Sequence, residues 1–144
     1  MAQRLFGLIP TTDVLPFAQQ AYYLGGPSLP NNSGWVGYTI GTFQMPWDGE
    51  LYAHLTTVYS FTGHQQVAQY LSGSPGPAMN ATYNHIAIIG SGSLRGQMPL
   101  YGRWTNLIRN QVVTLTLMIL SGGGGSAVAC EVISGTARAV RVAP

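Results

Sequence analysis

The side chains that could do chemistry in this chain are few, and its carboxylates come first. Asp13, Asp48, Glu50 and Glu131 are the only acids, and Asp48 and Glu50 are two residues apart, so an extended strand could present both on one face. Paired carboxylates that flank a cleft can hydrolyse glycosidic bonds. Asp48 precedes a glycine, however, and an Asp-Gly pair is typical of a turn in which the aspartate bonds the local backbone. We therefore expect these two acids to be structural.

Nucleophiles and metal ligands give no stronger signal. No serine lies in a Gly-x-Ser-x-Gly motif, and Cys130 follows the apolar residues 127–129, which predicts a buried, inert thiol. His54, His64 and His85 would be enough to hold zinc, but none of them has a short ligand spacing such as His-x-His. We therefore predict no catalytic residue, no metal and no cofactor, and we predict that the chain is not an enzyme.

The glycine run from Gly122 to Gly125 resembles a phosphate-binding loop only superficially. No Lys-Ser or Lys-Thr pair follows it, and no helix pattern begins after it. It is typical of the mobile tip of a hairpin.

Charged residues are scarce. Six arginines, four acids and no lysine make 7% of the chain, against about a quarter in average proteins. A free monomer normally stays dispersed through a more charged surface. We infer that much of the exterior is buried against other subunits, the alternative being a secreted, rigid β domain that tolerates low charge. The arginines are scattered and form no stripe that could follow phosphates, so nucleic acid is not expected as a partner.

Length and hydropathy set further limits. A chain of 144 residues fits one domain with a genuine core. The longest nearly unbroken apolar run, residues 112–120 with Thr114 and Thr116 within it, is too short to cross a bilayer as a helix, and the stretch after Arg4 is too brief for a secretory leader. We expect no membrane partner and a protein that is soluble, or becomes so once assembled.

Residues 1–33 differ from the rest of the chain. Four prolines at positions 10, 16, 27 and 30 interrupt apolar and aromatic residues, and this density excludes a long helix or a central strand. We predict that residues 1–33 form an extended N-terminal arm lying on its own domain or on a neighbour. A short helix over residues 13–22 is the local alternative.

From residue 34 to 144 the pattern has a period of two, which indicates β-strands. In residues 50–61 we expect one buried face with Leu51, Ala53, Leu55, Tyr59 and Phe61 and one polar face with Tyr52, His54, Thr56 and Ser60. In residues 111–120 we expect one apolar face with Val113, Leu115, Leu117 and Ile119. Expected strands cover residues 35–43, 50–61, 65–71, 81–89, 94–104 (one or two strands around Pro99), 111–120, 128–133 and 136–142. About eight strands with frequent turn signals predict an all-β fold, a single antiparallel β-sandwich or jelly roll.

Aromatic residues are the informative group, with three Trp and eight Tyr. Trp and Tyr are enriched at the centres of buried contacts, although many fill the core of their own domain. The candidate interface residues are Leu5, Phe6, Leu8, Phe17, Tyr22, Tyr23, Trp35, Trp47, Arg103 and Trp104.

Three features together resemble a family. They are the proline-marked N-terminal segment, the segment 42–53 with its strand, Pro-x-Asp-Gly turn and second strand, and the ending with residues 111–117, a glycine-rich tip and two closing strands. The whole resembles a capsid decoration (cement) protein of a tailed bacteriophage, or a related jelly-roll virion protein. The Pro-x-Asp-Gly pattern also occurs in trimeric jelly rolls of the tumour-necrosis-factor and C1q kind.

The resemblance implies a role rather than a reaction. It implies a virion protein, assembled in the host cytoplasm, that clamps major capsid protein or other virion subunits together. A homo-oligomer is implied, with a trimer favoured. The alternative function is a receptor- or carbohydrate-binding jelly-roll domain of a tail fibre or head spike.

Overall fold

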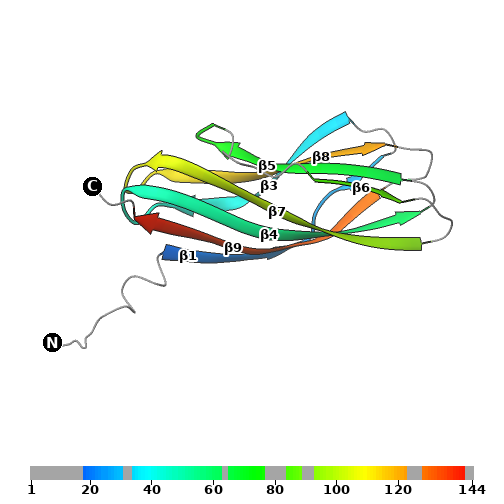
Figure 1. The fold of residues 1–144 in the computed structure, drawn as a ribbon, viewed down its shortest axis with the longest axis horizontal. Helices are drawn as coiled ribbons and strands as arrows, with labels where there is room; N and C mark the ends of the chain where they lie inside the picture. The colour runs from blue at the N-terminus through cyan, green and yellow to red at the C-terminus, as the bar shows by residue number, and fades with distance from the viewer. Residues whose placement is uncertain are drawn as a thin grey trace, which may run out of the picture.

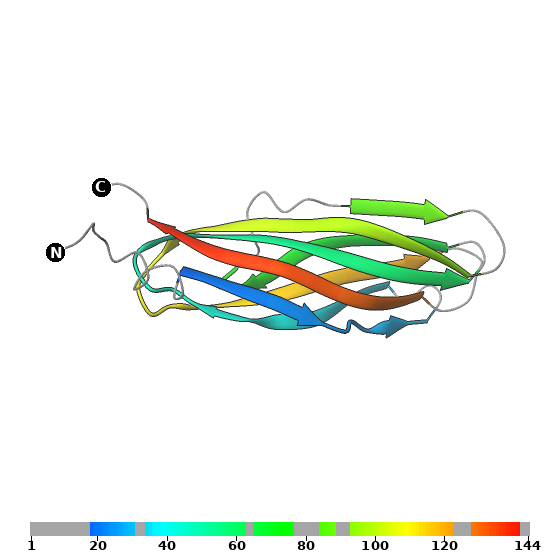
Figure 2. The same cartoon turned by 90° about the horizontal axis from the view of Figure 1, so that it is seen from below.

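The computed structural model describes residues 18–30, 34–62, 65–76, 84–88, 93–122 and 128–141, and these form two facing β-sheets (Figure 1). The strands of this part of the chain are β1 (Gln19–Leu24), β2 (Ser28–Leu29), β3 (Gly34–Gln44), β4 (Gly49–Thr62), β5 (Gln65–Ser74), β6 (Asn84–Ile88), β7 (Ser93–Leu107), β8 (Val112–Gly122) and β9 (Val128–Arg141). Figure 2 shows the same elongated sandwich from a second side, with β1 beside β9. Among the described residues, no helix is both long and apolar enough to cross a membrane.

The strand order is that of a jelly roll. The larger sheet has the order β1-β9-β4-β7 with β2 also on β9, and the smaller sheet has the order β3-β8-β5-β6. The pairs are nested: β1 and β2 pair with β9, β3 with β8, β4 with β7, and β5 with β6, all antiparallel. A long hairpin wrapped around itself gives this nesting, because successive strand pairs then alternate between two sheets. The predicted all-β jelly-roll sandwich is confirmed.

The core lies between the sheets because the strands alternate. On β8, Val113, Leu115, Leu117 and Ile119 are fully buried, while the residues between them are half-buried or exposed. The odd-numbered residues of β4 from Leu51 to Phe61 face the same core. These are the two faces that the period-two pattern predicted, and burial of such apolar area contributes roughly 25 cal/mol per Å².

The N-terminal segment belongs to the sandwich from residue 19 onward. Residues 19–24 and 28–29 are extended and join the larger sheet of their own domain as β1 and β2, both paired with β9. Of the two placements predicted for the arm, these residues therefore take the one on their own domain, and residues 19–22 do not form the alternative helix. Pro27 and Pro30 flank β2 instead of interrupting a strand, and β1 is an edge strand, where neighbouring prolines are tolerated. The rest of the predicted arm, residues 1–17, lies outside the described residues.

Of the one or two strands predicted around Pro99, a single one forms. Strand β7 runs through Pro99, and the proline is tolerated because β7 lies at the edge of its sheet and needs no backbone donor on its outer side. The break predicted between residues 133 and 136 does not occur. Strand β9 runs through Gly135, whose φ of 146° suits glycine. A Cβ at Gly135 would lie only 2.2 Å from the His54 carbonyl oxygen, so the close approach of β9 to β4 also requires glycine.

The predicted turn at residues 45–49 is present, but Asp48 does not bond that turn. Its Oδ1 accepts a hydrogen bond of 2.7 Å from the backbone N–H of Arg109, in the turn between β7 and β8. Met45 also exchanges backbone hydrogen bonds with residues 110 and 111. Asp48 therefore joins two turns at one end of the sandwich.

Candidate functional site

Charge is segregated between the two sheets. The four strands of the smaller sheet, β3, β5, β6 and β8, contain no Asp, Glu, Lys or Arg. Six charged residues of the larger sheet lie on β4, β7 and β9: Glu50, Arg95, Arg103, Glu131, Arg138 and Arg141. The two faces of the molecule therefore differ in what they can bind.

We call the outward side of β3, β8 and β5 the neutral face. It consists of the outward residues of β8 (Val112, Thr114, Thr116, Met118 and Leu120) and those paired with them on β3 (Trp35, Gly37, Thr39, Thr42 and Gln44) and β5 (Ala68, Tyr70, Ser72 and Ser74). One end is apolar and the rest is rich in hydroxyls. Covering a surface without charges costs much less hydration free energy than covering a charged one, and hydroxyls that find hydrogen-bond partners in the contact add little to this cost.

The apolar end of the neutral face is organised by Trp35 and Tyr70. Their rings meet edge to face with centroids 5.1 Å apart, from strands on either side of β8. Trp35 is nevertheless 41% exposed. Aromatic pairs of this geometry add about 1 kcal/mol beyond burial, so the pair can hold a rigid contact surface.

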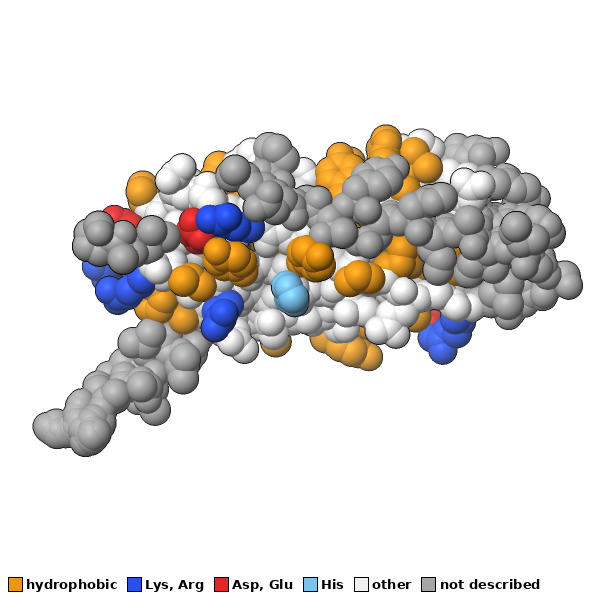
Figure 3. All heavy atoms as spheres, in the orientation of Figure 1, with side chains coloured by type: hydrophobic (Ala, Val, Ile, Leu, Met, Phe, Trp, Pro, Cys, Tyr) orange, Lys and Arg blue, Asp and Glu red, His pale blue; other side chains and the backbone are white. Residues whose placement is uncertain are grey.

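The outer side of the larger sheet, which we call the charged face, is built in cross-strand rows. One row is Gln19, Arg138, Tyr52 and Arg103; the next is Ala21, Thr136, His54 and Tyr101. Figure 3 shows this side, with hydrophobic and basic side chains gathered around an imidazole. Nearby, Tyr23 is 81% exposed.

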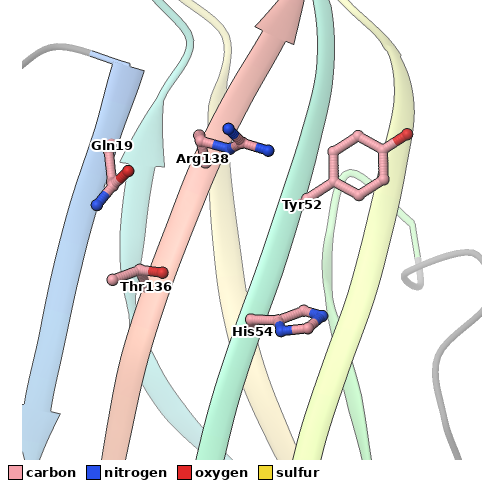
Figure 4. Close-up of a pocket in the computed structure, with 5 residues that line it drawn as sticks. All are labelled: Gln19, Tyr52, His54, Thr136 and Arg138. Carbon is pink, nitrogen blue, oxygen red and sulfur yellow. The ribbon is translucent and has the colours of Figure 1, made fainter. Parts of the chain in front are cut away.

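A hollow of about 350 Å³ lies on the charged face, lined by Gln19, Tyr52, His54, Thr136 and Arg138 (Figure 4). Its lining comes from β1, β9 and β4. The guanidinium of Arg138 extends from β9 toward β4 in this view. The hollow therefore combines one cation, two rings, an amide and a hydroxyl.

The rings of the hollow are held from the β7 side. Arg103 forms a two-contact ion pair with Glu50, at 2.8 and 3.2 Å, and its guanidinium lies 5.7 Å from the centroid of the Tyr52 ring. The Tyr52 hydroxyl donates to Oε1 of Glu50 at 2.8 Å. The hydrogen bond from Arg103, followed by that from Tyr52, holds the pKa of Glu50 below its usual value, so the carboxylate stays ionised.

The candidate interface residues fall into different environments. Tyr22 and Trp104 are core residues, which corrects their assignment as surface anchors: the Tyr22 hydroxyl donates to the Thr42 carbonyl, and Trp104 is 2% exposed. Trp47 packs partly against the core under the guanidinium of Arg141. Tyr23 and Trp35 are exposed, on opposite sheets.

The remaining interface candidates are one surface residue and four residues that the structure does not describe. Arg103 lies on the charged face in its ion pair with Glu50. Leu5, Phe6, Leu8 and Phe17 lie outside the described residues.

The residues considered for chemistry do not converge. Asp48 and Glu50 have separate structural partners, Arg109 and Arg103. Cys130 is buried, and burial raises the pKa of its thiol to about 11. In the part of the chain that is described, no three His, Cys, Asp or Glu residues gather as metal ligands. His64 and the side chain of His85 lie outside that part.

The fold defines this chain as a jelly-roll β-sandwich domain. No protein-family model matches the chain, and no curated protein sequence matches it. Among solved structures, it is similar to a chain of the T13 particle of infectious bursal disease virus, with 13% identity, 85% of this chain and 31% of that chain covered, and a TM-score of 0.51.

Two further solved structures are similar at lower scores. The globular domain of zebrafish complement 1qA is 13% identical, with 87% of this chain and 98% of that chain covered and a TM-score of 0.44. TmCBM61, solved in complex with β-1,4-galactotriose, is 8% identical, with 82% and 88% covered and a TM-score of 0.39. This chain spans about a third of the viral chains that it matches. At these identities the likeness shows the fold alone.

Sequence reasoning missed the hollow. Its residues come from positions 19, 52–54 and 136–138, and only the nested pairing of β1, β9 and β4 brings them together. The one available signal was the polar face predicted for Tyr52 and His54. The neutral face, in contrast, could have been found from the charge-free strands once their pairing was known.

Proposed function

We propose that this chain is a virion structural protein, a head decoration (cement) protein that bridges and stabilises capsid subunits. The observation that carries the proposal is the neutral face, the outward side of β3, β8 and β5 in a four-stranded sheet whose strands contain no Asp, Glu, Lys or Arg. The likeness to a virus-particle chain supports the fold required for such a role. The proposal that the chain bridges subunits is argued from the composition of the neutral face.

The neutral face suits contact with other protein subunits. A standard protein interface covers about 800 Å² on each partner, and burying the apolar part of such an area contributes roughly 25 cal/mol per Å². Because the face has no ions to screen, its contacts would be insensitive to salt. This property fits a particle that meets varied ionic conditions.

The partners proposed are copies of this chain and major capsid or other virion subunits. The exposed Trp35 with Tyr70 provides a rigid aromatic contact on the neutral face. We propose a homo-oligomer, with a trimer favoured, and no catalytic activity. Asp48 and Glu50 then serve only to hold turns and strands in place.

Sedimentation of matched variants tests this assignment. Thr116 and Thr56 are half-buried threonines on the outer sides of inner strands, β8 in the neutral face and β4 in the charged face. We expect the unaltered chain to sediment as a multiple of 15.4 kDa in low and high salt. Thr116→Arg should weaken association about 100-fold or more, because a covered charge loses hydration, whereas Thr56→Arg should not.

Uptake onto undecorated shells in high salt is the second measurement. The chain should bind the shells, and Thr116→Arg should reduce the bound amount. A chain that stays a compact monomer at high concentration and binds no shell contradicts the proposal.

The alternative function, a receptor- or carbohydrate-binding domain of a tail fibre or head spike, is favoured by a different observation. The hollow on the charged face has the mixture of rings and hydrogen-bonding groups that small-ligand sites use. The two roles occupy opposite sheets, so a single subunit could carry both.

A further inference from the structure

The hollow on the charged face forms because small side chains lie next to large ones in two neighbouring cross-strand rows. Ala21 pairs with Thr136, which pairs with His54, so two small residues lie beside the imidazole. In the neighbouring row, Gln19 and Tyr52 stand on either side of Arg138. The hollow therefore spans three strands, a width of about 10 Å at ordinary strand spacing.

The hollow is positively charged. Arg138 is exposed, and no ion pair is found for it among the described residues. The other charges facing this region, Arg103 and Glu50, neutralise each other in their ion pair beside Tyr52. One unneutralised guanidinium, with its planar fork of donors, matches a single carboxylate.

The other groups that line the hollow suit a ligand with hydroxyl groups better than a phosphate. Gln19 offers an amide, Thr136 a hydroxyl and His54 an imidazole, each able to exchange hydrogen bonds with a polyhydroxy ring. β9 and β4 are inner strands, so their backbone N–H groups are used in the sheet ladders and form no anion-binding nest. A single cation with neutral donors favours a sugar acid over a phosphate.

The rings are fixed before any ligand arrives. His54 stacks on Tyr101 with centroids 5.1 Å apart and planes 25° apart. Tyr52 is held by its hydrogen bond to Glu50 and by Arg103, which comes from β7, on the opposite side of β4 from the hollow. Preorganised rings lower the entropy cost of binding a weakly held ligand. They also offer apolar surface to the CH groups of a sugar ring.

We propose that this hollow binds an acidic saccharide, a sugar ring that carries one carboxylate. The carboxylate pairs with Arg138, the sugar hydroxyls contact Gln19, Thr136 and His54, and the ring lies against Tyr52. The volume of about 350 Å³ is at the lower end of the range for small-ligand sites. It therefore takes one or two sugar units at the end or side of a longer glycan. The inference rests on the alternative function above and not on subunit assembly.

Titration of the intact chain with defined sugars tests the site. The probes are 3′-sialyllactose and tri-galacturonic acid, which distinguish a sialic acid from a uronic acid, and lactose as the neutral comparison. We expect saturable binding of at least one acidic sugar by calorimetry, with a Kd between about 10 μM and 1 mM, and binding of lactose at least about tenfold weaker.

Three variants separate the site from general charge attraction. Arg138→Gln should weaken binding of the acidic sugar about tenfold or more, since a charge-assisted hydrogen bond is lost, and should leave the binding of lactose unchanged. Thr136→Val should weaken it about threefold or more. Arg95→Gln is the matched control on the same face: Arg95 pairs with Glu131 outside the hollow, so binding should stay within about twofold. The melting temperature of each variant is measured first, and binding is compared only among variants that melt near the temperature of the unaltered chain.

The outcomes are decisive in both directions. No saturation by either acidic sugar at about 10 mM overturns the proposal. Equal binding by Arg138→Gln and the unaltered chain also overturns it, as does an equal loss in Arg95→Gln. Thr116→Arg disables the neutral face and should still bind the acidic sugar, whereas Arg138→Gln should lose sugar binding and still sediment like the unaltered chain. These two results together would show that the sugar site and the assembly role are independent.

Discussion

Tyr59 donates a hydrogen bond of 2.7 Å to Oε1 of Gln69, and this contact joins β4 of one sheet to β5 of the other through an otherwise apolar core. Thr57 donates to the same oxygen at 2.7 Å, and Nε2 of Gln69 donates to the Pro99 carbonyl at 3.0 Å. Burial raises the pKa of Tyr59, so its hydroxyl remains a donor at neutral pH. One buried amide thus fixes how the two sheets face each other.

Replacing Gln69 tests this link. Gln69→Leu keeps the volume but leaves two hydroxyls and a carbonyl with fewer partners, so we expect the free energy of unfolding to fall by about 3 kcal/mol. Urea denaturation measures this change in the free energy of unfolding. Gln66→Leu, at an exposed position of the same strand, should change stability by less than about 0.5 kcal/mol.

A double-mutant cycle with Tyr59→Phe identifies the contact itself. The combined loss in Gln69→Leu/Tyr59→Phe should be smaller than the sum of the single losses by about 1 kcal/mol. Simple additivity would show that the two side chains do not share a hydrogen bond.

The close approach of β9 to β4 at Gly135 predicts a severe defect on adding one methyl group. In Gly135→Ala the new Cβ would lie 2.2 Å from the His54 carbonyl oxygen and 2.6 Å from the Leu55 Cα, at a φ of 146°. We expect a loss of about 3 kcal/mol or more, or failure to fold. In Gly25→Ala the Cβ would meet its nearest atom at an ordinary 3.8 Å, so its melting temperature should stay near that of the unaltered chain. Similar melting of both variants would contradict the register of β9 on β4.

How far the sequence predicts this molecule depends on the range of the interactions involved. The alternation in β4 and β8 is local, and it predicted both the strands and their buried faces correctly. Pro99 is also local, but its tolerance depends on β7 being an edge strand, which only the sheet order reveals. The sequence left the place of residues 19–24 open between their own domain and a neighbour for the same reason, since their pairing with β9 bridges more than a hundred residues.

The positions of the aromatic side chains and the hollow also depend on contacts between distant strands, which the sequence alone does not reveal. Composition cannot separate Trp104, in the core, from Trp35, on the neutral face, because each lies within a predicted strand. Arg138 and Tyr52 are neighbours only because β9 returns beside β4. Local patterns thus predict which face of a strand is buried, whereas the candidate sites depend on pairing between distant strands.

Alkaline pH should destabilise the chain through Tyr22. Burial raises the pKa of Tyr22 to about 12, against about 10 for an unfolded tyrosine, so the neutral phenol favours the folded state. This contribution is complete below about pH 10 and is lost as the pH rises through 12, by at most about 3 kcal/mol. Tyr22→Phe should show a smaller alkaline loss in urea unfolding between pH 9 and 12.

Two further results bear on that prediction. Tyr22→Phe should be about 1 kcal/mol less stable at neutral pH, because the hydrogen bond to the Thr42 carbonyl is lost. Tyr23→Phe, at an exposed position, should keep the alkaline profile of the unaltered chain. Equal alkaline losses in the unaltered chain and in Tyr22→Phe would contradict the assignment.

The thiol of Cys130 should be nearly inert in the folded chain. Burial raises its pKa to about 11, and a Cβ placed on Gly26 would lie 2.6 Å from its Sγ, so the β1–β2 connection covers the sulfur closely. Because the thiolate is the reactive form, alkylation by iodoacetamide at pH 8 should be about 100-fold slower in buffer than in urea, where the pKa is near 8.5. The native rate should still rise tenfold per pH unit from pH 8 to 10. A native rate that levels off near pH 9 would mean that the thiol is exposed to water, and the packing of Gly26 against Cys130 would then be wrong.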